Sequence, residues 1–183
     1  MIKKVDILGI QLDNYTVREA IMCVERYLSN NVLNTIESIS LQMLIDSETN
    51  PVLKEVMSSL DLAIIQAAGL ESMQRIRETE ENDFYFEFFK RIERNKKSVF
   101  LLGDTQEKID SLKAELAEDY PKLIFAGEYA VETCVGDLEA VINDMNATTP
   151  DVIISVLPSP MQEQFLYEHR DKMNANIWYG IGG

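Results

Sequence analysis

The fold is decided by the stretch Asp61-Leu62-Ala63-Ile64-Ile65-Gln66-Ala67-Ala68-Gly69. The apolar run 62–65 is typical of a buried central strand, and the residues behind it predict a turn and then a new helix. Ligands bind beyond the carboxyl ends of the strands in an open α/β sheet. A catalytic centre would therefore be expected at Gln66, although an amide cannot act as a base at neutral pH.

Strand and helix patterns alternate along the rest of the chain. The predicted strands, the first of them a strand or a hairpin arm, are 5–12, 35–40, 62–65, 98–104, 123–127, 151–157 and 176–183. The predicted helices are 16–30, 51–60, a segment after Gly69, 105–120, a segment from 136, and 162–173, with a further helix start at 41–45. The aromatic segment 84–94 is expected to pack in the core or form a helical lid, with an acceptor-binding surface as the alternative. This alternation predicts an α/β, Rossmann-like fold with a mostly parallel sheet and helices on both faces, in a single domain of residues 1–183.

The composition is that of an ordinary globular protein, with 46% hydrophobic and 26% charged residues. A formal charge of −14 leaves no basic surplus for a phosphate backbone, so nucleic acid is not expected as a partner. Cys23 and Cys134 show no metal or redox spacing and are expected to be free thiols. Because the sequence shows no leader pattern and no apolar run of about 18 residues, we expect a soluble, cytoplasmic protein.

The common cofactor motifs are absent from the sequence. Gly9 stands alone after the first predicted strand, so there is no G-x-G-x-x-G, and no G-x-x-x-x-G-K-[ST] occurs. The single histidine, His169, cannot make a metal site alone and is expected at the surface or partly packed. No nucleophile-elbow pattern marks a Ser/His/Asp set. We therefore expect neither a cofactor nor a metal site.

The order of several short motifs resembles the WecG/TagA/CpsF family of bacterial glycosyltransferases. These motifs are Ile7-Leu8-Gly9-Ile10-Gln11-Leu12-Asp13, the helix start Thr16–Glu19, Leu101-Leu102-Gly103, Pro160-Met161-Gln162-Glu163 and Gly180-Ile181-Gly182-Gly183. The resemblance covers the whole chain and implies transfer of an N-acetylhexosamine, typically N-acetylmannosamine, from a UDP-sugar to a polyprenyl-diphosphate-linked acceptor in cell-surface polysaccharide synthesis. It also implies action without an obligatory metal, peripheral association with the inner face of the membrane, and a tendency to form homo-oligomers.

The candidate site residues follow from this resemblance and from the rule that sites lie beyond strand ends. Ser38, Ser40 and Gln66 are expected to line the sugar and acceptor pocket. Gln162 and Glu163 are expected to contact the nucleotide sugar. The remaining candidates for substrate binding are turn glycines, of which the first two could cradle phosphate with backbone amides at helix N-termini: Gly69, Gly103, Gly180 and Gly182.

The sequence departs from the family at positions that matter for catalysis. Where the family has Pro-Asp-Gly-x-Gly, with the Asp proposed as general base, this chain has Ile65-Gln66-Ala67-Ala68-Gly69. The lysine of the family's Gly-x-Pro-Lys-Gln-Glu motif is replaced by Met161, and a Thr-Pro-Asn-like motif by Ser38-Ile39-Ser40. Glu37 and Glu71 are the nearest carboxylates in sequence that could substitute as the base, and the simpler interpretation of each is a solvated surface acid.

Two functions stay open at this point. The first is an active, strongly diverged glycosyltransferase. The second is a catalytically silent protein that binds a nucleotide sugar or regulates a full-length glycosyltransferase as its partner. The missing carboxylate and lysine favour the second, as does the fact that the family continues past its Gly-x-Gly-Gly with a basic tail whereas this sequence stops there.

Overall fold

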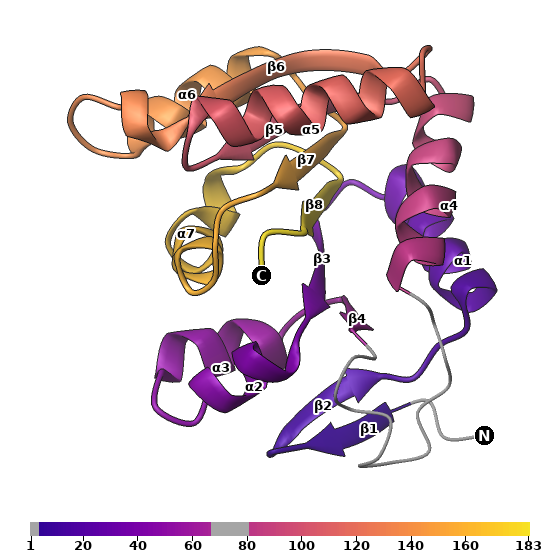
Figure 1. Cartoon of the computed structure of the whole chain (residues 1–183), viewed down its shortest axis with the longest axis vertical. Helices are drawn as coiled ribbons and strands as arrows, with labels where there is room; N and C mark the ends of the chain where they lie inside the picture. Colours follow the sequence, from indigo (N-terminus) through magenta and orange to yellow (C-terminus); the bar gives the residue numbers. More distant parts are fainter. Residues whose placement is uncertain (1–3, 67–80) are drawn as a thin grey trace.

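The structure is built on a six-stranded, all-parallel sheet in the spatial order β4-β3-β8-β7-β5-β6 (Figure 1). The computed structural model describes residues 4–66 and 81–183. The strands are β3 (Asn34–Ile39), β4 (Leu62–Ile65), β5 (Ser98–Gly103), β6 (Ile124–Ala130), β7 (Val152–Ser155) and β8 (Ile177–Gly180). Since all six run the same way, their carboxyl ends meet at one edge of the sheet.

Helices cover both faces of this sheet, which confirms the predicted Rossmann-like α/β fold (Figure 1). One face carries α1 (Val17–Ser29), α4 (Glu81–Arg94) and α5 (Gln106–Asp119). The other carries α2 (Leu41–Asp46), α3 (Pro51–Ser58), α6 (Glu139–Ala147) and α7 (Met161–His169), and two 3-10 turns, η1 (Val131–Thr133) and η2 (Arg170–Lys172), complete the described elements. No helix in the described part of the chain combines the length and the apolar character needed to cross a bilayer.

The aromatic segment forms α4 and packs in the core, as predicted. Phe84, Phe88 and Phe89 are fully buried, and the ring centroids of Phe88 and Tyr179 of β8 lie 4.6 Å apart. Phe86, on the opposite side of the helix, is exposed. A helix with one apolar stripe buries that stripe against the sheet, so the aromatic cluster fixes α4 rather than forming a binding surface.

A separate two-stranded hairpin precedes the sheet. It consists of β1 (Lys4–Ile7) and β2 (Ile10–Asp13), which pair antiparallel around a turn at Leu8 and Gly9. Gly9 has a φ of 83°, which glycine adopts without steric cost. The hairpin is fastened to the sheet because the Asp13 carboxylate accepts a hydrogen bond from the Ala63 amide of β4 at 2.9 Å.

The stretch 62–65 forms a strand, but the expectation that it is central was wrong. It is β4, at one edge of the sheet, whereas β8 lies in the middle between β3 and β7. The strand is apolar throughout because both of its faces are covered. Ala63 and Ile65 pack against the hairpin and α3, and Leu62 and Ile64 pack in the cluster on the opposite face. An edge strand that is covered on both faces has the same composition as a central one.

Several boundaries also differ from the predictions. The sixth helix begins at Glu139 instead of 136, and the seventh ends at His169, where η2 takes over. The strand predicted at 123–127 extends to Ala130. The helix predicted after Gly69 lies outside the described residues.

Candidate functional site

The carboxyl edge of the sheet brings together most of the residues expected at the site. Ser38 lies near the end of β3, Ser40 directly follows that strand, Gln66 follows β4, and Gly103 ends β5. Gly180 ends the central strand β8, with Gly182 two residues beyond it, while Gln162 and Glu163 lie in the first turn of α7. Gly69 lies outside the described residues.

Gln66 connects two of these strand ends. Its backbone N–H donates to the Ile39 carbonyl oxygen at 2.9 Å, which extends the pairing of β3 and β4 by one residue. Its side-chain Nε2 lies 3.4 Å from the Gly183 carbonyl oxygen, a long hydrogen bond. The half-buried amide therefore lies between β4 and the segment that follows β8.

The two serines at the end of β3 have different environments. Ser40 caps α2, with its side-chain oxygen accepting a hydrogen bond from the Met43 amide at 3.2 Å. Ser38 is fully buried, and its hydroxyl has no hydrogen-bond partner among the described residues. A buried hydroxyl without a partner is costly, so Ser38 is the serine that has hydrogen-bonding capacity to spare.

A buried polar network joins α7 to β3 and to the chain beyond β8. Gln162 is fully buried, and its Nε2 donates to Glu37 Oε1 at 3.2 Å and to Glu163 Oε2 at 3.1 Å. Its Oε1 accepts from the Gly182 amide at 3.3 Å. Ser159, before α7, donates its hydroxyl to Glu163 Oε1. Every polar atom of the Gln162 amide group therefore has a partner in this network.

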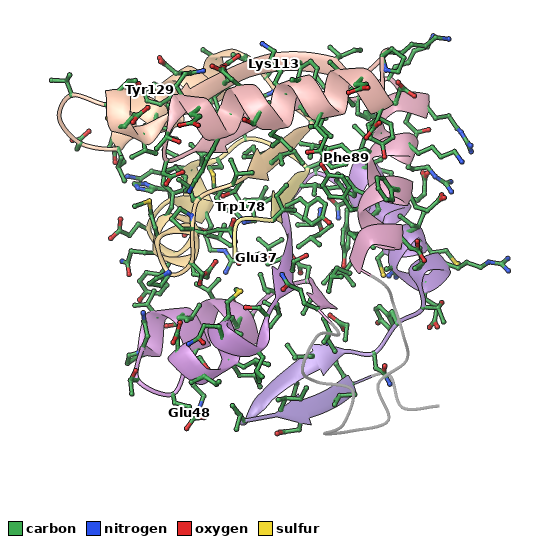
Figure 2. The ribbon with its side chains drawn as sticks, viewed as in Figure 1. Glu37, Glu48, Phe89, Lys113, Tyr129 and Trp178 are labelled. Carbon is green, nitrogen blue, oxygen red and sulfur yellow. The ribbon has the colours of Figure 1, made fainter. Side chains whose placement is uncertain are left out.

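Glu37 is fully buried, so the interpretation of this residue as a solvated surface acid was wrong. Figure 2 shows Glu37 near the middle of the molecule, in the same region as Trp178. Burial, and then the neighbouring Glu163 carboxyl, raise the pKa of Glu37 well above its usual range. A carboxyl group without exposed surface is out of reach of a substrate and is therefore a poor general base.

Glycines allow the chain beyond β8 to approach this network closely. A Cβ atom at Gly180 would lie 2.6 Å from Gln162 Nε2 and 2.8 Å from Glu37 Cγ. At Gly182 it would collide with the Leu157 carbonyl, and at Gly183 with the Met43 sulfur. The glycine-rich segment is thus required by close packing, since none of these three has a positive φ.

A surface hollow of about 660 Å³ opens beside Gly182. Its lining includes Val156, which follows β7, and Thr105 and Lys108 at the start of α5. Lys108 is paired with Asp104 at 2.9 Å. Gly103 lies directly before this turn, where a Cβ would come within 2.8 Å of the Ile109 side chain. The hollow is therefore a concave space that adjoins the strand ends and contains one lysine.

The first turn of α5 is already occupied by groups of the chain itself. The Thr105 hydroxyl accepts from the Lys108 amide at 3.3 Å, and the Glu132 carboxylate accepts from the Gln106 amide at 2.8 Å. A phosphate at this helix end would have to take the place of Glu132, because both would use the same N–H group.

No group of three or more His, Cys, Asp and Glu side chains suited to a metal ion occurs among the described residues. His169 is buried at the end of α7, with its ring centroid 4.8 Å from that of Phe165. Cys23 and Cys134 are free thiols, as predicted.

Two members of the network were not predicted from the sequence. Ser159 was not singled out, and Glu37 was considered as a base but not as a buried partner of Gln162. A signal for Glu37 was present, because it lies inside the strand predicted at 35–40, and all six residues of the observed strand Asn34–Ile39 are buried. A carboxylate inside such a strand requires a buried partner.

Comparison with known proteins agrees with this architecture. The model of the glycosyl transferase WecG/TagA/CpsF family matches residues 5–183. Similar curated proteins include the N-acetylglucosaminyldiphosphoundecaprenol N-acetyl-beta-D-mannosaminyltransferases of Staphylococcus aureus strains NCTC 8325 / PS 47 and MRSA252. Each is 22% identical over 188 residues, which cover 98% of this chain and 73% of the relative. The match spans nearly the whole chain, and the resemblance seen in the motifs is confirmed: the chain belongs to the WecG/TagA/CpsF family of glycosyl transferases.

Proposed function

We propose that the protein transfers an N-acetylhexosamine from a UDP-sugar to a lipid-diphosphate-linked acceptor. The observation that carries the proposal is the convergence of Gln66, Gln162 and the Gly180–Gly183 segment at the carboxyl edge of a sheet of the glycosyltransferase family. The Staphylococcus aureus relatives are named for transfer of N-acetylmannosamine to such an acceptor. The hollow beside Gly182 supplies a concave surface next to these residues for the donor.

In this reaction the acceptor hydroxyl oxygen forms a bond to the anomeric carbon of the sugar. The bond between that carbon and the diphosphate oxygen breaks, and UDP leaves with the electron pair. The hydroxyl proton must pass to a base. Gln66 orients the hydroxyl by hydrogen bonding but cannot accept its proton, so the proton passes to solvent.

Transfer without a positioned base is slow. General-base catalysis contributes about 10²–10⁴-fold to a rate, which is the deficit expected from Gln66. The two carboxyl groups beside the Gly180–Gly183 segment, Glu37 and Glu163, are fully buried and bonded to Gln162. A missing positive charge lowers the rate further, because Met161 stands where the family has a lysine. Among the described residues, the cation that remains for the diphosphate in the hollow is Lys108.

The acceptor determines where the protein works. A polyprenyl chain stays in the bilayer, so the site must reach its diphosphate from the membrane surface. We therefore place the protein at the inner face of the membrane as a peripheral protein, in contact with a lipid-linked acceptor and, through self-association, with further copies of itself.

The first test is thermal unfolding of the purified protein with UDP, UDP-N-acetylglucosamine and UDP-N-acetylmannosamine. A ligand at about 100 times its Kd adds about 2.7 kcal/mol to the free energy of unfolding and raises Tm by several degrees. Transfer to a short-chain lipid-diphosphate N-acetylglucosamine acceptor is then followed with alanine variants of Ser38, Ser40, Gln66 and Gln162. If no variant lowers transfer, the assignment of these residues is wrong, and if no ligand raises Tm, the donor site is absent.

A second function is favoured by the amide at position 66. A chain that binds the donor and lacks the base would act as a silent, regulatory partner of a full-length glycosyltransferase. Gln66→Asp separates the two functions, because it restores a carboxylate at the strand end. We expect this variant to transfer about 10²–10⁴-fold faster than the unmodified protein. Donor binding with no transfer by either protein would assign the chain to the silent function.

A further inference from the structure

Two carboxyl groups from distant parts of the chain are buried together at the strand ends. Glu37 comes from β3 and Glu163 from the first turn of α7, and both are fully buried. Two ionised carboxylates side by side in a buried site repel each other and lack solvation, so such pairs hold a proton between them. Burial raises the pKa of Glu37, and among the described residues the neighbouring Glu163 is the ionisable group that raises it further.

The orientation of the Gln162 amide follows from these carboxyls. An amide has an N–H side that can only donate and an oxygen that can only accept. Both carboxyl groups accept from Gln162 Nε2, at 3.2 Å from Glu37 and 3.1 Å from Glu163. The Oε1 atom is thereby turned toward Gly182 and accepts a hydrogen bond from the Gly182 amide N–H at 3.3 Å. With the amide reversed, its oxygen would face carboxylate oxygens and its N–H would face a backbone N–H.

We infer that the Glu37 carboxyl keeps its proton beside Glu163, and that the two groups together orient Gln162 and, through it, fix the Gly180–Gly183 segment at the carboxyl edge of the sheet. Glu37 is in this sense a positioning residue. It lies opposite Gly180 in the β3–β8 pairing, where the absence of a side chain lets Gln162 reach it.

The two carboxyl groups affect ligand binding because they fix the Gly180–Gly183 segment. Gly182 lines the hollow beside α5, and the Gly183 carbonyl accepts from Gln66. A segment that is fixed before the ligand arrives loses less entropy on binding. This part of the inference rests on the proposed function, whereas the proton and the fixed segment can be tested without any donor.

The test compares Glu37→Gln, which keeps an acceptor for Gln162, with Glu37→Leu, which removes it. Amide hydrogen exchange of Gly182 is measured by NMR on the full chain. We expect exchange about tenfold faster in Glu37→Leu and within about threefold of the unmodified protein in Glu37→Gln. Rescue by the isosteric variant separates a positioning role from mere packing volume, since leucine fills the space as well.

Infrared spectroscopy reports on the Glu37 proton. In a pH titration, the C=O stretch of a protonated carboxylic acid should persist to a higher pH in the unmodified protein than in Glu37→Gln. Glu168→Gln is the matched control, because Glu168 lies on α7 but is exposed. This variant should change neither the infrared band nor the exchange of Gly182.

The outcomes separate the inference from the proposed function. A carboxylic-acid band that persists to the same pH in Glu37→Gln, or Gly182 exchange that is unchanged in Glu37→Leu, overturns the inference. If the unmodified protein binds a UDP-sugar, Glu37→Leu should weaken that binding about fivefold or more, and equal affinity would overturn the link to the ligand. If the unmodified protein binds no UDP-sugar, the proposed function fails, while exchange and infrared data still decide on the pair.

Discussion

Replacing Gly180 with alanine tests how closely the central strand approaches the buried polar network. The new Cβ would lie 2.6 Å from Gln162 Nε2, 2.7 Å from Gln162 Cδ and 2.8 Å from Glu37 Cγ. The backbone cannot retreat, because Gly180 is paired with Glu37 on one side and with Ser155 on the other. The Gln162 side chain must therefore move and give up its hydrogen bonds.

The magnitude follows from those bonds. Gln162 bonds to two buried carboxyl groups and to the Gly182 amide. A hydrogen bond to a charged group contributes about 1.5–3 kcal/mol, and a buried group left unsatisfied costs about 1–3 kcal/mol. The lower unfolded-state entropy of alanine offsets about 0.4–1 kcal/mol. We expect Gly180→Ala to lower the free energy of unfolding by about 3 kcal/mol and Tm by about 6–12 °C.

Urea and thermal unfolding at pH 7 measure this loss. Gly127→Ala is the matched control, since its Cβ would come no closer than 3.1 Å, to the Phe100 ring, and should cost about 1 kcal/mol, the low end for an added core carbon. The decisive comparison places Gly180→Ala in a Gln162→Ala background, where the obstructing side chain is gone. The alanine should cost much less there. An equal loss in both backgrounds would refute the reasoning.

Three further predictions concern the core, the hairpin and the buried carboxyl. Phe88→Ala should lower the free energy of unfolding by about 3–5 kcal/mol in urea, since Phe88 is fully buried, and a loss below about 1 kcal/mol would contradict its place in the core. Asp13→Ala should cost about 1–3 kcal/mol by the same measurement, because it leaves the Ala63 amide without its acceptor; an unchanged urea midpoint would contradict this. Burial first, and a neighbouring carboxyl second, raise the pKa of Glu37, so the folded protein keeps a proton that the unfolded chain releases above about pH 4.3. Stability should therefore fall as the pH rises from there toward the folded pKa, by up to about 1.4 kcal/mol per pH unit, and thermal unfolding of Glu37→Gln across the same pH range should lack this contribution.

Local patterns were sufficient to predict most of the architecture. The apolar run 151–157 became the buried strand β7, and the aromatic spacing at Phe84, Phe88 and Phe89 became the packed side of α4. The order of the strands across the sheet could not be predicted from local sequence patterns. Every residue of the edge strand β4 and of the central strand β8 is buried, because both strands are covered on two faces, so burial does not distinguish an edge from a centre.

The candidate site was predictable in position but not in its contacts. Strand ends mark a ligand-binding edge in any parallel sheet, so Gln66 and Gly180 could be placed there from the sequence. The bond between Gln162 and Glu37 joins residues 125 positions apart, and no spacing rule reaches that far. The burial of Glu37 depends on α7 and β8 both packing beside β3, which is a property of the assembled sheet.

The place of β8 has a consequence for how the chain is made. The strand in the middle of the sheet comes last among the described strands, and it alone is paired with both β3 and β7. Without β8, the pairings left in the sheet are β4 with β3 on one side and β7 with β5 with β6 on the other, and no strand pairing joins the two groups. Exposed strand edges on such partly made chains invite mispairing. The sheet and its ligand-binding edge are thus completed in the same step, when β8 joins the two groups of strands.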